Sequence, residues 1–329
     1  PAMLEAVRNA HIKVLEYSHS AGFESYRKKS VSYYERFGIK LNHNQIMITT
    51  GGSEAILFGM MACLDPGDEV IIPEPFYANY NGFAVAAGVN IVPITSHIEN
   101  GFALPPIADF EAKISDKTKA IVICNPNNPT GTFLSGSQID AFIRRVPSHV
   151  VVVIDEAYNE FLTPEQQYDA IAWVREFPNV IVSRSFSKAY GLAGLRIGYG
   201  IAQPQLTDLL NRIRQPFNVN SLAQAAAIAA LADEAFLKKC YELNRAGYVQ
   251  LTQAFEQMGL RYLPSSGNFV LVKVGDEPNS GAKVNLELLK AGIIVRPVGN
   301  YGLPEWLRIS IGLPEENQAF IEALKKILN

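Results

Sequence analysis

The sequence predicts an α/β fold with a mostly parallel sheet, followed by a smaller α+β region. Through the first two thirds of the chain, short runs of valine and isoleucine alternate with helical patterns, which is typical of βαβ units. After a long helical pattern at residues 234–258, the chain shows three more short strands and a final helix. With 329 residues, the chain is long enough for a large core and two domains.

The elements follow from the spacing of apolar residues. Residues 1–37, with a break at 17–22, predict two helices packed as a hairpin. The first two thirds then predict strands at 45–50, 69–73, 88–94, 119–124, 150–154, 179–183 and 196–201. Helical patterns lie at 51–64, 109–114 and 221–232. The last third predicts strands at 267–273, 293–296 and 307–311, with a helix at 314–328.

The composition excludes several classes of function. A net charge of −3 offers no basic surface for a nucleic acid or a membrane. The cysteines Cys63, Cys124 and Cys240 are far apart, and the five histidines lack metal-ligand spacing. This pattern predicts reduced thiols, no metal and a cytoplasmic location. No apolar run reaches the roughly 18 residues needed to span a bilayer. Chemistry on small molecules is the expected function.

One stretch, residues 183–198, presents an amine beside a site for an anion. Lys188 lies between hydroxyl residues and a glycine-rich turn, and Arg196 follows eight residues later. An amine near a second cation in a partly dry pocket has a lowered pKa and can form a Schiff base with an aldehyde. Serine hydroxyls and a guanidinium bind phosphate well. An aldehyde and a phosphate on one molecule indicate pyridoxal phosphate, although a lysine in such a motif is more often a surface residue.

Other candidate residues follow predicted strands, where open α/β sheets bind their ligands. Gly52 and Ser53 open a helix whose N-terminal amides suit a phosphate, although an ordinary serine cap explains them as well. Tyr77 could stack on a planar cofactor, although such an aromatic residue more often packs in the core.

Asp155 directly follows the aliphatic run 150–154, so its carboxylate needs a cationic partner. The nitrogen of a pyridine ring is such a partner, because a carboxylate there keeps it protonated. Asn128, in a rigid turn, and Tyr158 can donate to the phenolate oxygen of the same ring. One pyridoxal phosphate therefore accounts for all of these features together.

Three motifs carry a resemblance to a known family. They are NPTG at 128–131, DEAY at 155–158 and SFSKAYGLAGLR at 185–196. In their order and spacing, the chain resembles the fold-type-I pyridoxal-phosphate aminotransferases over essentially its whole length. The resemblance implies a large domain with a seven-stranded, mostly parallel sheet sandwiched by helices, and a smaller α+β domain. The implied boundaries are 27–238 for the large domain, with 1–26 and 239–329 forming the small one.

The resemblance also implies a role for each site residue. Lys188 would be the Schiff-base lysine, and Asp155 would be the partner of the pyridine nitrogen. Tyr158 and Asn128 would bind the phenolate oxygen, and Arg308 would bind the substrate carboxylate. The residues implied for the cofactor phosphate are Gly52, Ser53, Ser185, Ser187 and Arg196. Tyr17 falls where the family reaches the cofactor phosphate of the neighbouring subunit, which implies a homodimer with shared sites.

Two parts of the chain point to different subfamilies. From about residue 121 onward, the motifs and the segment 292–304 look like those of histidinol-phosphate aminotransferases. Before that, 49–56 and 74–81 look more like the aspartate-type enzymes. A natural mosaic, a chimera or the diversity of the family would each explain the difference. Our first hypothesis is a histidinol-phosphate aminotransferase that uses a 2-oxoacid such as 2-oxoglutarate.

Several alternatives stay open. An aspartate or aromatic amino acid aminotransferase needs only a different side-chain pocket. A decarboxylase or β-lyase on the same scaffold would release carbon dioxide or pyruvate without an oxoacid acceptor. A ligand-sensing module without catalysis, of the kind fused to transcription regulators, belongs to another class. The complete set of residues from Tyr77 to Arg308 and the lack of a DNA-binding segment argue against that last alternative.

Overall fold

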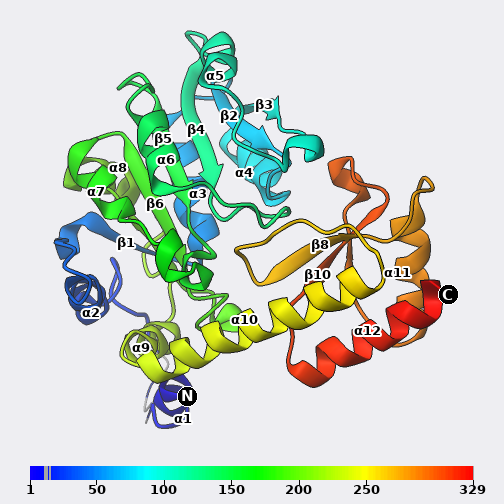
Figure 1. Cartoon of the computed structure of the whole chain (residues 1–329). Helices are drawn as coiled ribbons and strands as arrows, with labels where there is room; N and C mark the ends of the chain where they lie inside the picture. The colour runs from blue at the N-terminus through cyan, green and yellow to red at the C-terminus, as the bar shows by residue number, and fades with distance from the viewer. Residues whose placement is uncertain (11–13, 15, 329) are drawn as a thin grey trace.

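The protein is described here from a computed structural model, which covers residues 1–10, 14 and 16–328. Its strands form two sheets, one of seven strands and one of three. Figure 1 shows the larger sheet among the helices of the first two thirds of the chain, with the smaller sheet beside it. This is the α/β fold with a smaller α+β part that the sequence predicts.

The large sheet is mostly parallel. Its strands are β1 (Ile46–Thr49), β2 (Glu69–Glu74), β3 (Asn90–Thr95), β4 (Thr118–Cys124), β5 (Val151–Asp155), β6 (Val180–Ser185) and β7 (Gly198–Ile201). They lie in the order β1-β7-β6-β5-β4-β2-β3. Only β7 runs against its two neighbours, β1 and β6. The prediction of a mostly parallel seven-stranded sheet is confirmed.

Helices cover both faces of this sheet, because alternate strand residues point to opposite sides. In β5, Val152 and Ile154 belong to one hydrophobic core, whereas Val153 belongs to the other. On the first side pack α2 (Glu24–Glu35), α5 (Ile107–Lys113), α6 (Gly136–Ile143), α7 (Ala170–Glu176) and α9 (Ser221–Ala230). On the second side pack α3 (Gly52–Cys63), α4 (Asn79–Ala87) and α8 (Pro204–Ile213).

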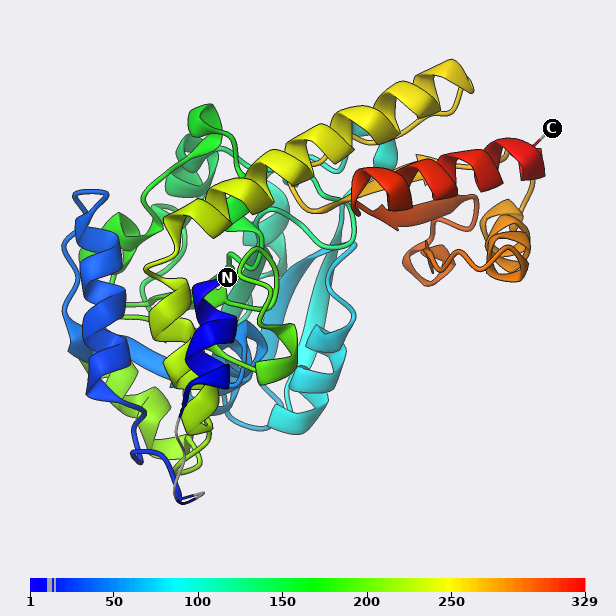
Figure 2. The same cartoon turned by 90° about the horizontal axis from the view of Figure 1, so that it is seen from below.

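The N-terminal helices both pack against α9 (Figure 2). α1 covers only Ala2–Arg8, so the helix expected to reach the break at 17–22 is shorter than its periodicity suggests. Met3 of α1 belongs to the core that α2 and α9 share. The expected packed hairpin is therefore replaced by two helices that use α9 as a common partner.

The small sheet is antiparallel, with the order β8 (Phe269–Lys273), β10 (Trp306–Ser310) and β9 (Arg296–Pro297). Its core is shared with α11 (Ser280–Lys290), α12 (Pro314–Leu328) and the later turns of α10 (Glu234–Gln257). The strand predicted at 293–296 is thus only the short β9. None of the helices described has the length and apolar character needed to cross a membrane.

The long helix α10 connects the two parts of the molecule. It begins beside α9 and ends over the small sheet (Figures 1 and 2). The domain division at 26/27 and 238/239 stays a prediction, and the second boundary lies inside this helix. α1 packs on α9, which belongs to the range predicted for the large domain.

Candidate active site

Ten of the predicted site residues line one pocket at the carboxyl ends of the parallel strands. They are Gly52, Ser53, Tyr77, Asn128, Asp155, Tyr158, Ser185, Ser187, Lys188 and Arg196. These residues come from the first turn of α3, the loops after β2 and β4, the end of β5 and the turn after it, and the end of β6 with the segment that follows. Parallel strands bring their carboxyl ends to one edge of the sheet, so residues far apart in sequence meet there.

One end of the pocket is built for close approach of an anion. Gly51 has φ 82°, and a Cβ on it would lie 2.9 Å from Nη2 of Arg196. A Cβ on Gly198 would lie 2.6 Å from the backbone nitrogen of Gly52. Nη1 of Arg196 lies 3.3 Å from the Ser187 hydroxyl. The free amides at the start of α3 and this guanidinium give the positive field that suits a phosphate.

Lys188 lies above the ring of Tyr158, with Nζ 5.3 Å from the ring centroid. Its side chain is exposed to the pocket, but the surrounding protein still removes part of the water around the ammonium. This partial burial lowers the pKa of Lys188, and the positive charge of Arg308 lowers it further. A larger fraction of neutral amine follows, and the neutral amine is the nucleophilic form.

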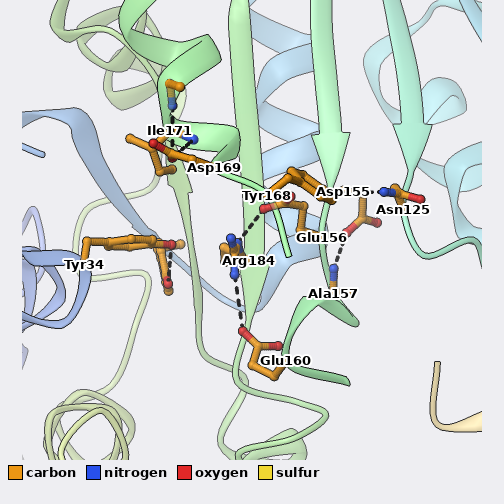
Figure 3. Close-up of polar contacts among 12 residues, drawn as sticks. Tyr34, Asn125, Asp155, Glu156, Ala157, Glu160, Tyr168, Asp169, Ile171 and Arg184 are labelled. Atoms are coloured by element: carbon orange, nitrogen blue, oxygen red, sulfur yellow. Dashed lines mark hydrogen bonds and ion pairs between the residues drawn. The ribbon is translucent and has the colours of Figure 1, made fainter. Parts of the chain in front are cut away.

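Asp155 is buried at the end of β5 and holds two hydrogen bonds. The Tyr80 hydroxyl donates to Oδ2 at 2.7 Å, and the Ala157 backbone N–H donates to Oδ1 at 3.2 Å (Figure 3 shows the second). Burial raises the pKa of Asp155, while these two donors counteract the rise. The carboxylate is therefore oriented, and among the described residues no cation is hydrogen-bonded to it, although a buried charge needs such a partner.

A chain of hydrogen bonds joins the small sheet to the pocket. Nη1 of Arg308, in β10, donates to Oδ1 of Asn128 at 2.6 Å. Nδ2 of Asn128 donates to the Tyr158 hydroxyl at 2.9 Å. The Arg308 guanidinium also lies over the ring of Phe269, 4.9 Å from its centroid. Nε of Arg308 is buried without a partner among the described residues.

Tyr17 lies outside this pocket in the single chain. Its side chain is 82% exposed and stacks on Phe217, with the ring centroids 4.8 Å apart. Arg308 is also absent from the pocket lining, but Asn128 joins it directly to the site. The structure thus brings together all the predicted residues except Tyr17.

Sequence reasoning missed Tyr80 and Cys124. Tyr80 is fully buried in α4, and its phenol is the closest partner of Asp155. Its place three residues after Tyr77, on the same side of a helical turn, was the available signal. Cys124 lines the pocket at the end of β4, directly opposite Asp155 in the strand register. Burial raises the pKa of this thiol well above its usual range, so it is present as the neutral thiol.

A family model for aminotransferase class I and II matches residues 1–324. The chain belongs to the class I and II aminotransferases. Histidinol-phosphate aminotransferase 2 of Ralstonia nicotianae is 60% identical over 283 residues, which cover 86% of this chain and 75% of that protein. Histidinol-phosphate aminotransferase 1 of Thiobacillus denitrificans is 45% identical and covers 100% of this chain and 82% of its own.

Solved structures of aminotransferases share the fold. Histidinol-phosphate aminotransferase from Sinorhizobium meliloti, in complex with pyridoxal-5'-phosphate, has a TM-score of 0.87 at 27% identity, covering 100% of this chain and 87% of that one. Aspartate aminotransferase from Thermus thermophilus with maleate has a TM-score of 0.86 at 26% identity, covering 99% and 87%. The protein is a pyridoxal-phosphate-dependent aminotransferase of fold type I that acts on small molecules.

The pocket fits pyridoxal phosphate. A Cβ on Gly51 would fill the space beside the Arg196 guanidinium. A glycine there leaves room for a phosphate to approach both the backbone and the guanidinium. The lysine, the buried carboxylate and the hydroxyl donors line the same pocket. This donor set matches an aldehyde, a pyridine nitrogen and a phosphate on one molecule.

Proposed function

We propose that this aminotransferase transfers the amino group of histidinol phosphate to a 2-oxoacid such as 2-oxoglutarate. The observation that carries the proposal is Arg308, whose guanidinium donates to Asn128 of the pocket lining. The names of the curated relatives, at 45–60% identity, support the choice of substrate.

Each pocket residue has a proposed role toward the cofactor. The phosphate would be held by the hydroxyls and backbone of Gly52, Ser53, Ser185 and Ser187, together with the Arg196 guanidinium. Support comes from the close approach at the start of α3 and from the contact between Arg196 and Ser187.

The ring would lie between the aromatic side chain of Tyr77 and the Lys188 side of the pocket. Asp155 would pair with the pyridine nitrogen, and Asn128 and Tyr158 would donate toward the phenolate oxygen. When bound, pyridoxal phosphate supplies an electron sink for the carbanion that forms at the substrate Cα. The hydrogen bonds to Asp155 from Tyr80 and Ala157 support its role, because they fix the direction in which the carboxylate points.

Lys188 would do the proton transfer. Its amine would form the covalent link to the cofactor aldehyde and would be released when the amino donor binds. The free Nζ would then act as the general base that takes the proton from the donor's Cα and returns it on the cofactor side. The lowered pKa of Lys188 supports this role, because a base must be largely neutral at the working pH.

Arg308 would bind the anionic group of the substrate. A guanidinium can hold a carboxylate or a phosphate through two parallel N–H donors, which a lysine cannot do. In the proposed reaction, the same arginine meets the phosphate of histidinol phosphate in one half-reaction and the carboxylate of the oxoacid in the other.

A homodimer with shared sites is proposed as the working form. Tyr17 and Phe217 form an exposed aromatic pair, with 82% and 42% of their surface accessible. Exposed large apolar side chains are typical of surfaces that another molecule covers. A second copy that covers this pair would carry Tyr17 toward the cofactor phosphate of its neighbour. We also propose a cytoplasmic location, which the three free cysteines suit.

An aspartate aminotransferase is the second candidate. The structural similarity to the Thermus thermophilus enzyme and the segments 49–56 and 74–81 favour it. The two candidates differ in the amino donor that reacts first.

The test is a half-reaction with single donors. The cofactor-loaded protein is mixed separately with histidinol phosphate, aspartate, glutamate and phenylalanine, and the loss of its visible absorbance is followed. We expect histidinol phosphate and glutamate to bleach the absorbance fastest. A faster reaction with aspartate than with histidinol phosphate would replace the first candidate by the second. A faster reaction with phenylalanine would indicate an aromatic amino acid aminotransferase instead.

A further inference from the structure

A buried ion cluster lies directly behind the pocket. Arg184 of β6 sits between two carboxylates, with Nε 2.7 Å from Oε2 of Glu156 and Nη1 3.4 Å from Oε1 of Glu160 (Figure 3). The three side chains are 7%, 0% and 6% exposed, in that order. The site chemistry described above uses none of them.

The cluster joins two strands at the places where they deliver site residues. Glu156 directly follows Asp155, and Arg184 directly precedes Ser185. Asp155 and Ser185 line the pocket, whereas Glu156 and Arg184 do not. The backbone N–H of Glu156 also donates to the carbonyl of Ser183 at 3.0 Å. The ion pair therefore ties the end of β5 to the end of β6 from the side away from the pocket.

Burial of this ion pair carries a large desolvation cost. A buried ion pair is often no more stabilising than apolar residues of the same volume, so its presence is better explained by the geometry that it enforces. The contact between Arg184 and Glu156 is close but not aligned as a hydrogen bond. Its attraction is therefore mainly electrostatic, and it acts along the line between the two strand ends.

We propose that Arg184, Glu156 and Glu160 are positioning residues, which fix the positions of Asp155 and Ser185 relative to the cofactor. The inference rests on the roles proposed above for those two residues. Removal of the pair lets the two strand ends shift. The Asp155 carboxylate and the Ser185 hydroxyl would then no longer both be placed to contact the bound cofactor. In metal sites, replacement of the groups that orient the ligands costs about 10- to 100-fold in affinity or activity, and we expect an effect of this order here.

The test compares Glu156→Gln with a matched control, Glu176→Gln. Glu156→Gln keeps the shape of the side chain and leaves Arg184 a carboxylate partner in Glu160. The control lies in a second cluster of one arginine and two carboxylates, formed by Arg144 with Asp140 and Glu176 on α6 and α7. That cluster is about half exposed and lies outside the pocket.

Three quantities are measured on the full chain of each variant. They are the melting temperature, the dissociation constant of pyridoxal phosphate for the cofactor-free protein, and the pH titration of the visible absorbance of the loaded protein. A purely structural role would lower the melting temperature alone. We expect Glu156→Gln to weaken cofactor binding about ten-fold or more and to shift the titration, while Glu176→Gln changes neither.

Equal cofactor affinity and an equal titration in Glu156→Gln and the wild type would overturn the proposal, whatever the melting temperature. If Glu156→Gln does not fold, Glu160→Gln is the second variant, with a smaller effect in the same direction expected and the same overturning result. Cofactor binding needs no substrate, so this outcome is separate from the donor screen. A wild type that binds the cofactor but ignores histidinol phosphate would refute only the proposed substrate.

Discussion

The pKa values of Lys188 and Asp155 shift in opposite directions in one pocket. Partial burial and Arg308 lower the pKa of the lysine, whereas burial raises the pKa of the aspartate. Both shifts favour neutral groups, and the hydrogen bond from Tyr80 works against the second shift. The hydrogen bond from the neutral Tyr80 therefore favours the charged form of Asp155, and a bound pyridinium would favour it further.

Replacement of Lys188 by alanine removes both the covalent link and the proposed base. We expect Lys188→Ala to lose the visible absorbance of the loaded protein and at least about 10³-fold in kcat, since general-base catalysis contributes factors of this size. Absorbance spectra and steady-state transamination check this, with circular dichroism as the control for folding. A variant that keeps both the absorbance and the activity would contradict the assignment of Lys188.

Tyr80→Phe should move the pH profile. Loss of the hydroxyl takes away a hydrogen bond to the charged form of Asp155, so the pKa of Asp155 rises further. Activity requires the ionised carboxylate, and the acid limb of kcat against pH should therefore shift to higher pH. Tyr26→Phe is the matched control, because its buried hydroxyl has no partner among the described residues. An unmoved acid limb in Tyr80→Phe would show that Asp155 does not depend on Tyr80.

At the scale of elements, the pocket depends on how closely β7 approaches the start of α3. A Cβ on Gly198 would lie 2.6 Å from three atoms: the Arg184 carbonyl oxygen, the Gly51 carbonyl carbon and the Gly52 nitrogen. Backbone atoms cannot move aside cheaply, so only glycine fits. At the same place the hydroxyl of Ser183, in β6, donates to the carbonyl of Gly52, the first residue of α3, at 2.9 Å.

Gly198→Ala should therefore separate β7 from α3. We expect a loss of about 2 kcal/mol in the free energy of unfolding, which is typical of overpacking, together with weaker cofactor binding. Gly194→Ala is the control, because its Cβ would meet nothing within 4 Å. Urea unfolding and cofactor titration measure the two effects. Equal stability of the two variants would contradict the tight contact at Gly198.

Sequence patterns predicted the strands of the large sheet well and their directions less well. The apolar runs that became β4, β5 and β6 mark buried strands, since both faces of a parallel sheet are covered. Periodicity carries no direction, so the antiparallel course of β7 was not predictable from its residues. The three motifs contain seven of the ten predicted lining residues, and the places of Gly52, Ser53 and Tyr77 after strands gave the other three. The bond from Tyr80 to Asp155 depends on how α4 packs, which no local pattern encodes.

For the whole molecule, the buried cluster behind the pocket makes stability depend on pH. Burial raises the pKa of Glu160 to about 7, although Arg184 opposes the rise. The folded chain then binds this proton more tightly than the unfolded chain, whose glutamate has its ordinary pKa of about 4.3. Between these two values, the free energy of unfolding falls as pH rises, by up to about 4 kcal/mol for this group.

Urea unfolding of the wild type and of Glu160→Gln at about pH 5 and about pH 8 checks this prediction. The wild type should lose more stability over this range than the variant, and the difference isolates Glu160 from the other titrating groups. Equal losses would mean that Glu160 stays ionised in the folded protein throughout.

The long helix α10 gives the molecule a mechanical property. Its 24 residues extend over about 36 Å, from the large sheet's helical cover to the small sheet that carries Arg308. A tilt of about 5° at its first turn displaces its far end by about 3 Å, which is the length of one hydrogen bond. Because the later turns of α10 pack against the small sheet, a change in the angle of this helix would move Arg308 relative to Asn128.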